Sequence, residues 1–374
     1  KGLGFKKNGG VRINGGTNRI EELDTLPFLP LSLAALDSYR ISGKKSAMVF
    51  TSRGCPRRCG FCSLPGSPAG KYRVKSPGRV IQEIRFYVNR YGIGHFDIED
   101  DSFTADPARA EKILDALCLE SGGEIEFSAM NGIDYTTLSP ALIRKMKRAG
   151  FKKLDISAVT CDAKSLSEAG RAGSNRKLYS VIRAAEKENL ETEVHFIIGL
   201  PTETWRKTLK TLFYLSKKPV IPGGSVFYPV PGSLLFRRGL KEGWIGEKDD
   251  PSLWRSSLAY ADRKSYSRKK QITILFLTRI VHFLKRLSGL ERYENVSMRK
   301  TARRLLKKIS FPDRDKYGLE LLDLFFRKRE ARKLYFSGRY YYRGPRYGLD
   351  DEVLVKFLNR NQALKSRLPS RLSR

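Results

Sequence analysis

Long apolar runs are absent from this sequence, and so is a secretion-type leader. The longest clean apolar run, residues 272–278, is far shorter than the roughly 20 residues that a membrane-spanning helix needs. The first forty residues are mixed and Gly-rich, without the apolar segment of a signal peptide. We therefore expect no transmembrane helix and a cytoplasmic protein, with peripheral attachment to a membrane as the alternative. The chain begins with Lys1 rather than Met, which predicts a processed or truncated N-terminus.

Cysteine and histidine are scarce, with five cysteines and three histidines in 374 residues. The cysteine count is odd, and three of the five fall within residues 55–62. A disulfide framework needs paired, dispersed cysteines, so this pattern excludes one. It predicts a reducing compartment and a metal site.

Acidic residues are few relative to basic ones: 39 Asp and Glu stand against 72 Lys and Arg, a net charge of +33. From Ala261 onward, 31 basic and 11 acidic residues give a net +20. Such a region attracts the phosphates of nucleic acid or of an anionic membrane surface. The alternative is a solvated face without a specific partner.

Apolar residues make up 40% of the chain, enough for a packed core, and exclude global disorder, coiled coil and collagen. Short apolar segments alternate with amphipathic ones after residue 44. The predicted strands are 47–51, 95–99, 124–129, 153–158, 193–199 and 225–230. The predicted helices are 77–90, 107–119, 140–149, 176–188 and 204–216, three of which begin with Pro after Ser or Asp. Six strand–helix repeats predict an α/β fold, a partial (β/α)6 TIM-like barrel.

Three regions follow from this pattern. Residues 1–44 are a lead-in, 45–244 are the barrel, and 245–374 are a basic, mainly helical C-terminal region. Further helices are predicted there at 269–287, 297–309, 316–334 and 350–364. Between the last two, aromatic residues alternate with arginine, which suits base stacking or a lipid interface. The alternative is a helical cover over the barrel mouth.

The predicted chemistry lies in one loop after the first strand, with the spacing Cys55-x3-Cys59-x2-Cys62. Three thiolates this close suit three corners of a [4Fe–4S] cluster, which leaves one iron open to a small molecule. Ligands collect in loops at the carboxyl ends of such strands. The alternatives are redox thiols or a zinc knuckle, but structural zinc needs a fourth ligand. Cys118 and Cys161 are isolated and are expected in the core.

This motif, with Phe61 directly before its third cysteine, resembles the radical S-adenosylmethionine (SAM) superfamily. The resemblance implies a [4Fe–4S] cluster on the three cysteines and an open iron that chelates the amino and carboxylate groups of SAM. It also implies reductive cleavage of SAM to methionine and a 5′-deoxyadenosyl radical, with electrons from a reductant such as flavodoxin or ferredoxin. Phe61 would lie against the adenine of SAM.

Further segments resemble the cobalamin-binding subgroup of this superfamily. They are GKYRVKSPGRVIQEI (70–84), IEDDSFT (98–104), MNGID (130–134), GLPTET (199–204) and YPVPGS (228–233). Residues 23–40 resemble the segment that joins an N-terminal cobalamin domain to the barrel, so the resemblance covers about residues 1–240. Two departures stand out. The chain has no recognisable cobalamin domain, and Val159 stands near the position of a glutamate that helps to hold SAM.

Side chains that follow the strands are candidate SAM contacts. Asp100 and Asp101 suit hydrogen bonds from the ammonium or ribose of SAM, and Asn131 suits its carboxylate or ribose. Ser157 or Thr160 would take the place of the missing glutamate. A role in local turns is the alternative for Asp101 and Asn131.

Three more candidates lie farther along the chain. Arg171 would neutralise the SAM carboxylate, or it is a surface arginine. The backbone from Gly199 to Pro201 would approach adenine, or it simply ends a strand. Tyr228 would line the substrate cavity, or it is a core residue. His95 and His195 fall in strand patterns and are expected in the core.

Together these observations predict a radical SAM enzyme that performs methyl transfer or rearrangement on a small-molecule or lipid substrate. The full-length protein is expected to depend on cobalamin. One alternative is an RNA-modifying enzyme resembling the radical SAM methylthiotransferases, which suits the positive charge. The other is a non-enzymatic module that binds nucleic acid or membrane and holds a structural metal.

Overall fold

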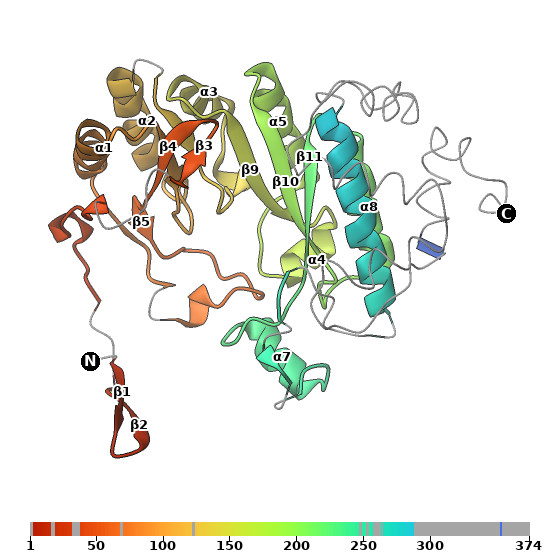
Figure 1. Cartoon of the computed structure of the whole chain (residues 1–374). Helices are drawn as coiled ribbons and strands as arrows, with labels where there is room; N and C mark the ends of the chain where they lie inside the picture. The colour runs from red at the N-terminus through yellow and green to blue at the C-terminus, as the bar shows by residue number, and fades with distance from the viewer. Residues whose placement is uncertain are drawn as a thin grey trace.

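The computed structural model describes residues 3–15, 19–31, 38–67, 70–121, 124–246, 249–251, 254–256, 263, 265–287 and 352–353. Figure 1 shows strands flanked by helices, with the hairpin of β1 (Gly4–Lys7) and β2 (Gly10–Ile13) projecting at the N-terminal end. Among the described helices, none is both long and apolar enough to cross a membrane.

The barrel wall consists of parallel strands in chain order. One sheet contains β3 (Arg40–Ile41), β4 (Lys44–Val49), β7 (His95–Ile98) and β8 (Glu126–Ser128), with β3 antiparallel to β4. The other contains β9 (Lys153–Val159), β10 (Glu191–Ile198) and β11 (Ile221–Val226). Parallel bridges from Phe127 to Phe151 and from Ile133 to Ile156 join the two sheets. The predicted α/β fold with a partial (β/α)6 barrel is therefore confirmed.

Helices connect these strands and cover the outer face of the sheet. They are α1 (Pro77–Tyr91), α2 (Pro107–Ser121), α3 (Pro140–Arg148), α5 (Asn175–Lys187) and α6 (Trp205–Ser216). The side chains of Ser76, Ser139 and Ser174 each accept a hydrogen bond from a backbone N–H of the first turn that follows. Pro77 and Pro140 are the first residues of their helices. The N–H group that proline lacks would have no partner within the helix at this position. These capping residues explain why the predicted helix starts agree closely with the structure.

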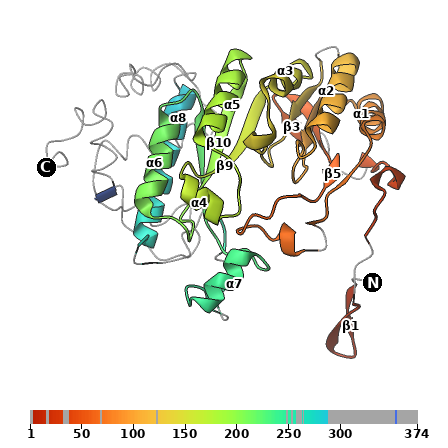
Figure 2. The same cartoon turned by 180° about the vertical axis from the view of Figure 1, so that it is seen from behind.

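The remaining helices agree only in part with the prediction. Two short helices, α4 (Ala163–Glu168) and α7 (Leu234–Lys241), go beyond it. Helix α8 (Arg268–Leu287) matches the helix predicted at 269–287 and packs against β11, β10 and α6; Figure 2 shows it beside α6. This part of the basic region covers the barrel. The helices predicted at 297–309 and 316–334, and the aromatic segment between the last two predicted helices, lie outside the described residues. Only two residues of 350–364 are described.

The last strand is displaced from its predicted position. It was expected at 225–230 but lies at Ile221–Val226, in register with β10. The sequence of this strand contains Pro222, Gly223 and Gly224, residues that local propensity disfavours in a strand. Close neighbours explain the glycines: a Cβ on Gly224 would lie 2.9 Å from Ile198 and 3.0 Å from Thr278 of α8. Tertiary packing therefore overrides the local preference.

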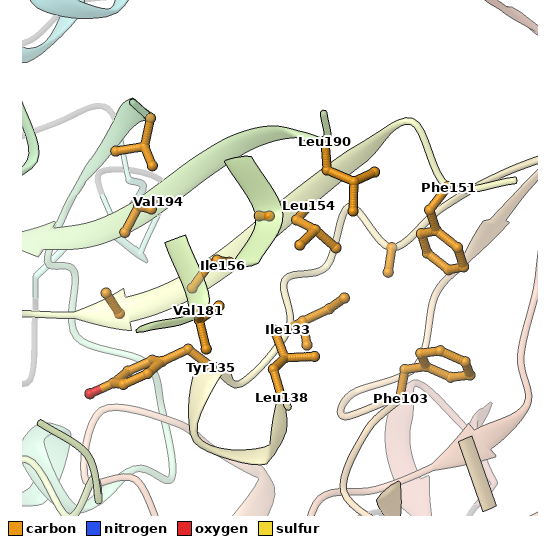
Figure 3. Close-up of a cluster of buried hydrophobic side chains, with 14 of the residues drawn as sticks. Phe103, Ile133, Tyr135, Leu138, Phe151, Leu154, Ile156, Val181, Leu190 and Val194 are labelled. Atoms are coloured by element: carbon orange, nitrogen blue, oxygen red, sulfur yellow. The ribbon is translucent and has the colours of Figure 1, made fainter. Parts of the chain in front are cut away.

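The hydrophobic core lies between the sheet and its helices. Figure 3 shows part of it, where Leu154 and Ile156 of β9 meet Val181 of α5 and Val194 of β10. Successive strand residues point to opposite faces, so Lys153, Asp155 and Ser157 lie on the inner face of the barrel.

The two strand histidines differ in their environment. His95 is buried, as expected, and its Nδ1 lies 3.1 Å from Ser46 Oγ. The side chain of His195 is 38% exposed, so the expectation of a core residue is wrong for this position. The reason is alternation along β10, which turns His195 to the inner face while its neighbours Val194 and Phe196 enter the core.

Candidate cofactor site at the cysteine loop

The cysteines lie on a loop whose two ends pair with each other as short antiparallel strands. Strand β5 (Ser52–Arg53) pairs antiparallel with β6 (Arg73–Val74), so the ends of the loop lie side by side. Within the loop, the backbone N–H of Cys55 donates to the carbonyl of Gly70 at 3.2 Å, and that of Cys62 to Cys59 at 3.1 Å. Cys55, Cys59 and Cys62 are free thiols. They are available as ligands on one ordered segment.

The electrostatics of the loop disfavour thiolates until a cation is present. Burial raises the pKa of Cys55, and a backbone N–H from Arg57 only partly offsets it. Burial also raises the pKa of Cys62, where the neighbouring charges of Cys59 and Cys55 add to the effect. A metal centre would supply positive charge that favours the thiolates of Cys55 and Cys62 against this effect of burial.

Asp100 anchors the strand end that leads into the loop. Its side chain is buried, and its carboxylate accepts hydrogen bonds from the backbone N–H groups of Thr51 and Ser52 at 2.6 and 3.0 Å. Both hydroxyls donate to its other oxygen. The structure thus gives Asp100 four partners within the protein, a role that the sequence interpretation missed. Asp101 is exposed and accepts one bond, from Gly54 N–H at 2.8 Å. A contact of either residue with SAM stays a prediction.

Arg171 reaches the cysteine loop from the segment after α4. It donates to Cys59 Sγ at 3.5 Å and to the carbonyl of Ser157 at 3.2 Å. Its guanidinium also lies 3.5 Å from Asp134 Oδ1. The other carboxylate oxygen of Asp134, Oδ2, forms an ion pair with Arg57 Nε at 2.9 Å. The side chain of Arg171 is only 9% exposed, so it is not a surface arginine. A positive charge is therefore held beside a thiol.

Gly170 allows this close approach. Its φ is +69°, and a Cβ there would lie 2.7 Å from the carbonyl oxygen of Arg58. Gly60 N–H donates to the carbonyl of Ala169 at 2.9 Å, which joins the same two segments. Because only glycine fits without strain, the segment before Arg171 and the cysteine loop form one packed unit.

Phe61 belongs to a small apolar cluster at the ends of three strands. It packs against a cluster of buried residues from separate parts of the chain: Val159, Leu166, Leu200, Phe227 and Leu235. Val159 has a φ of +66°, a genuine outlier for a β-branched residue, and it follows a register shift in the pairing of β9 with β10. Strain of this kind concentrates at binding sites. Phe61 against adenine stays a prediction.

The remaining predicted residues lie at the same ends of the strands. Asn131 is exposed and its amide lies 3.5 Å from the carbonyl of Asp100. Ser157 and Tyr228 are half-buried, and Ser157 offers its carbonyl to Arg171. The structure thus brings these residues to the end of the barrel that carries the cysteine loop, while their contacts with SAM stay predictions.

The backbone from Gly199 to Pro201 has partners of its own. Arg263 donates to the carbonyls of Gly199, Leu200 and Pro201 at 2.9, 3.0 and 2.8 Å. The side chain of Gln271 occupies the space where a Cβ of Gly199 would stand. Sequence reasoning could not find Arg263, which lies more than sixty residues away in a region without a motif.

Glu203 is a second residue that sequence reasoning missed, although it lies within the landmark 199–204. It is 3% exposed, and burial raises its pKa to about 7. Its carboxyl accepts hydrogen bonds from the hydroxyls of Thr208, at 2.7 Å, and Thr160. It therefore ties the end of β9 to α6. Cys118 and Cys161 pack against the main core, as expected.

Comparison with known proteins adds a match to a family model and a similar fold. Residues 49–215 match the model of the radical SAM superfamily. An uncharacterized methyltransferase of Pyrococcus horikoshii is 28% identical over 236 residues, 63% of this chain and 51% of the relative. Cytidylyl-2-hydroxyethylphosphonate methyltransferase of Streptomyces wedmorensis is 24% identical over 251 residues, 63% and 46% of the two chains. The chain thus spans about half the length of these curated relatives.

One solved structure has a similar fold. It is the cobalamin-dependent S-adenosylmethionine radical enzyme OxsB with aqua-cobalamin and S-adenosylmethionine bound. The TM-score is 0.58 at 12% identity, covering 96% of this chain and 59% of that one. At this identity the similarity establishes the architecture alone.

Proposed function

We propose, from the premise that this chain carries a domain of the radical SAM superfamily, that it is the catalytic barrel of a methyltransferase. The observation that carries the proposal is the ordered loop with three free thiols beside Arg171. The names of the two curated relatives described above support methyl transfer. Because the chain spans about half of their length, the activity is proposed for the protein that contains it.

The donor set of the loop fits a [4Fe–4S] cluster. Cys55, Cys59 and Cys62 would hold three irons. The positive charge of the metal would offset the burial that raises the pKa of Cys55 and of Cys62. Arg171 would offset the negative charge of the thiolates. When bound, the cluster and SAM together supply one-electron cleavage of the SAM sulfonium bond.

The residues of this chain would orient SAM and exclude water. Asp101 and Asn131 are exposed acceptor and amide groups at the ends of β7 and β8, and they suit the polar end of SAM. Phe61 and Leu200 belong to the apolar cluster, which suits the adenine. Asp100 would act indirectly, because its four hydrogen bonds hold the strand end before the loop.

The sequence landmarks of the cobalamin-binding subgroup extend the proposal to cobalamin as a cofactor of the whole protein. The substrate would be a small molecule or a lipid, and a flavodoxin or ferredoxin would deliver the electrons. The net charge of +33 also suits the phosphates of RNA or an anionic membrane surface.

Anaerobic reconstitution tests the proposal. The wild-type chain should bind about four irons with sulfide and, after reduction with SAM, release 5′-deoxyadenosine detectable by mass spectrometry. Cys59→Ser should lose both properties. Cys118→Ser is the matched control, because Cys118 is a partly buried cysteine outside the loop, and it should behave as wild type. Equal iron content in Cys59→Ser and wild type would contradict the assignment of ligands.

A further inference from the structure

A second group of potential metal ligands lies on the inner face of the barrel. Glu193 and His195 are two residues apart on β10 and therefore point to the same side. Asp155 of β9 is directly opposite Glu193 in the parallel register. The fold thus places three ligating side chains from adjacent strands together.

The distances within this group suit a single ion. One carboxylate oxygen from each acid and one imidazole nitrogen all lie within 4.8 Å of one another. His195 Nε2 is 3.2 Å from Asp155 Oδ1 and 3.9 Å from Glu193 Oε1. Imidazole with carboxylates is a donor set that first-row divalent metals prefer.

Lys153 neutralises only part of the negative charge. Its Nζ lies 2.8 Å from Asp155 Oδ1 and 2.8 Å from Glu193 Oε2, so one ammonium takes one oxygen from each acid. The other oxygen of Asp155, Oδ2, is buried and has no hydrogen-bond partner among the described residues, in a side chain that is 4% exposed. Glu193 Oε1 lies 3.8 Å from His282 Nδ1 of α8. A buried carboxylate oxygen without a partner is costly, and a cation at this point would satisfy it.

Space and access complete the site. Gly223 of β11 lies against it, and a Cβ there would come within 2.5 Å of His195 Nδ1 and 2.8 Å of Glu193 Oε1. The side chain of His195 is 38% exposed, which leaves a route for an ion. Ser157, whose carbonyl binds Arg171, is the next inner-face residue after Asp155, about 7 Å along the strand. The group is therefore near the cofactor side of the barrel but separate from the cysteines.

We infer that Asp155, Glu193 and His195 bind one divalent first-row transition-metal ion of the Zn²⁺ class. Lys153 keeps its two carboxylate oxygens and orients both acids, as outer-shell partners of metal ligands commonly do. Three protein ligands leave a fourth tetrahedral position open, which suits an oxygen atom of a substrate.

Zinc titration of the full chain tests this site, in a variant with Cys55→Ser, Cys59→Ser and Cys62→Ser that removes the thiol ligands. We expect one equivalent of Zn²⁺ to bind in competition with a chromophoric chelator. Adding His195→Gln should weaken binding by roughly 100-fold or more, since even outer-shell changes cost 10–100-fold. Glu193→Gln should act similarly while keeping an oxygen for Lys153.

Two controls make the outcome decisive. His95→Gln removes a buried strand histidine outside the group and should leave zinc affinity unchanged. Co²⁺ in the triple-serine variant should give a visible ligand-field band without sulfur charge transfer, and His195→Gln should abolish it. His195 is partly exposed, so this variant should fold, which circular dichroism verifies. Absence of stoichiometric zinc in the triple-serine variant, or equal affinity in His195→Gln, overturns the inference. Neither result affects the iron and 5′-deoxyadenosine assay, so the two proposals fail separately.

Discussion

Glu203 makes the stability of the barrel depend on pH in an unusual direction. Its carboxyl is buried beside Thr160 and Thr208, and burial raises its pKa from 4.5 to about 7. Between these two values the folded chain holds a proton on Glu203 that the unfolded chain has released. The folded state then binds more protons, so the free energy of unfolding falls as the pH rises through this window.

The size of the effect follows from the shift in pKa. A displacement from 4.5 to about 7, at 1.36 kcal/mol per unit, corresponds to roughly 3 kcal/mol above pH 7. Ionised Glu203 destabilises the fold by this amount relative to a group with an ordinary pKa. Glu203→Gln cannot ionise, so this variant should lose the pH dependence that Glu203 causes.

Urea denaturation at several pH values between 5 and 8 measures the difference. Relative to Glu203→Gln, the wild-type free energy of unfolding should fall by about 2 to 3 kcal/mol across this range. Glu186→Gln, which changes an exposed acid on α5, should follow the wild-type profile. Parallel profiles for wild type and Glu203→Gln would refute the argument, because they would mean that Glu203 titrates alike in both states.

Two further predictions concern the supports of the cysteine loop. Gly170→Ala places a Cβ 2.7 Å from the Arg58 carbonyl oxygen at a φ of +69°. In the urea assay it should lower the free energy of unfolding by roughly 1–3 kcal/mol, and it should reduce the iron bound on reconstitution. The control is Gly78→Ala, where the new Cβ has open space, and it should raise the free energy of unfolding by about 0.5–1 kcal/mol. Asp100→Asn replaces an acceptor oxygen by an NH2 donor that faces other donors, so it should lower the free energy of unfolding by roughly 3 kcal/mol. Asp101→Asn affects one hydrogen bond at an exposed residue and should lower it clearly less. Similar losses of stability in the two variants would contradict the anchoring role of Asp100.

The sequence predicts the barrel well where local rules dominate. Period-2 segments and serine–proline helix starts are visible in one dimension, and Ser139 with Pro140 caps α3 as expected. It fails at β11, because Gly223 and Gly224 are required by neighbours from β10 and α8 that only the fold brings together. Tertiary contacts therefore determine the position of β11.

The candidate site also combines features that local sequence predicts with features that only the fold reveals. The spacing of Cys55, Cys59 and Cys62 is a local pattern and could be read directly. The contact of Arg171 with Cys59 joins residues 112 positions apart, so no local pattern reveals it. Arg263 lies outside every motif, yet it binds three successive carbonyls after β10, 62 to 64 positions away.

The ladder between β5 and β6 has a consequence for how the loop evolves. Pairing of Ser52 with Val74 and of Arg53 with Arg73 closes the loop at its base, independently of the thiols. Once the base is closed, extra residues within the loop add only a slow, logarithmic entropy cost. The segment between the third cysteine and β6 can therefore gain or lose residues without shifting the barrel strands. Relatives with the same ladder should differ most in length there, and such variation would reshape the rim of the site while preserving its ligands.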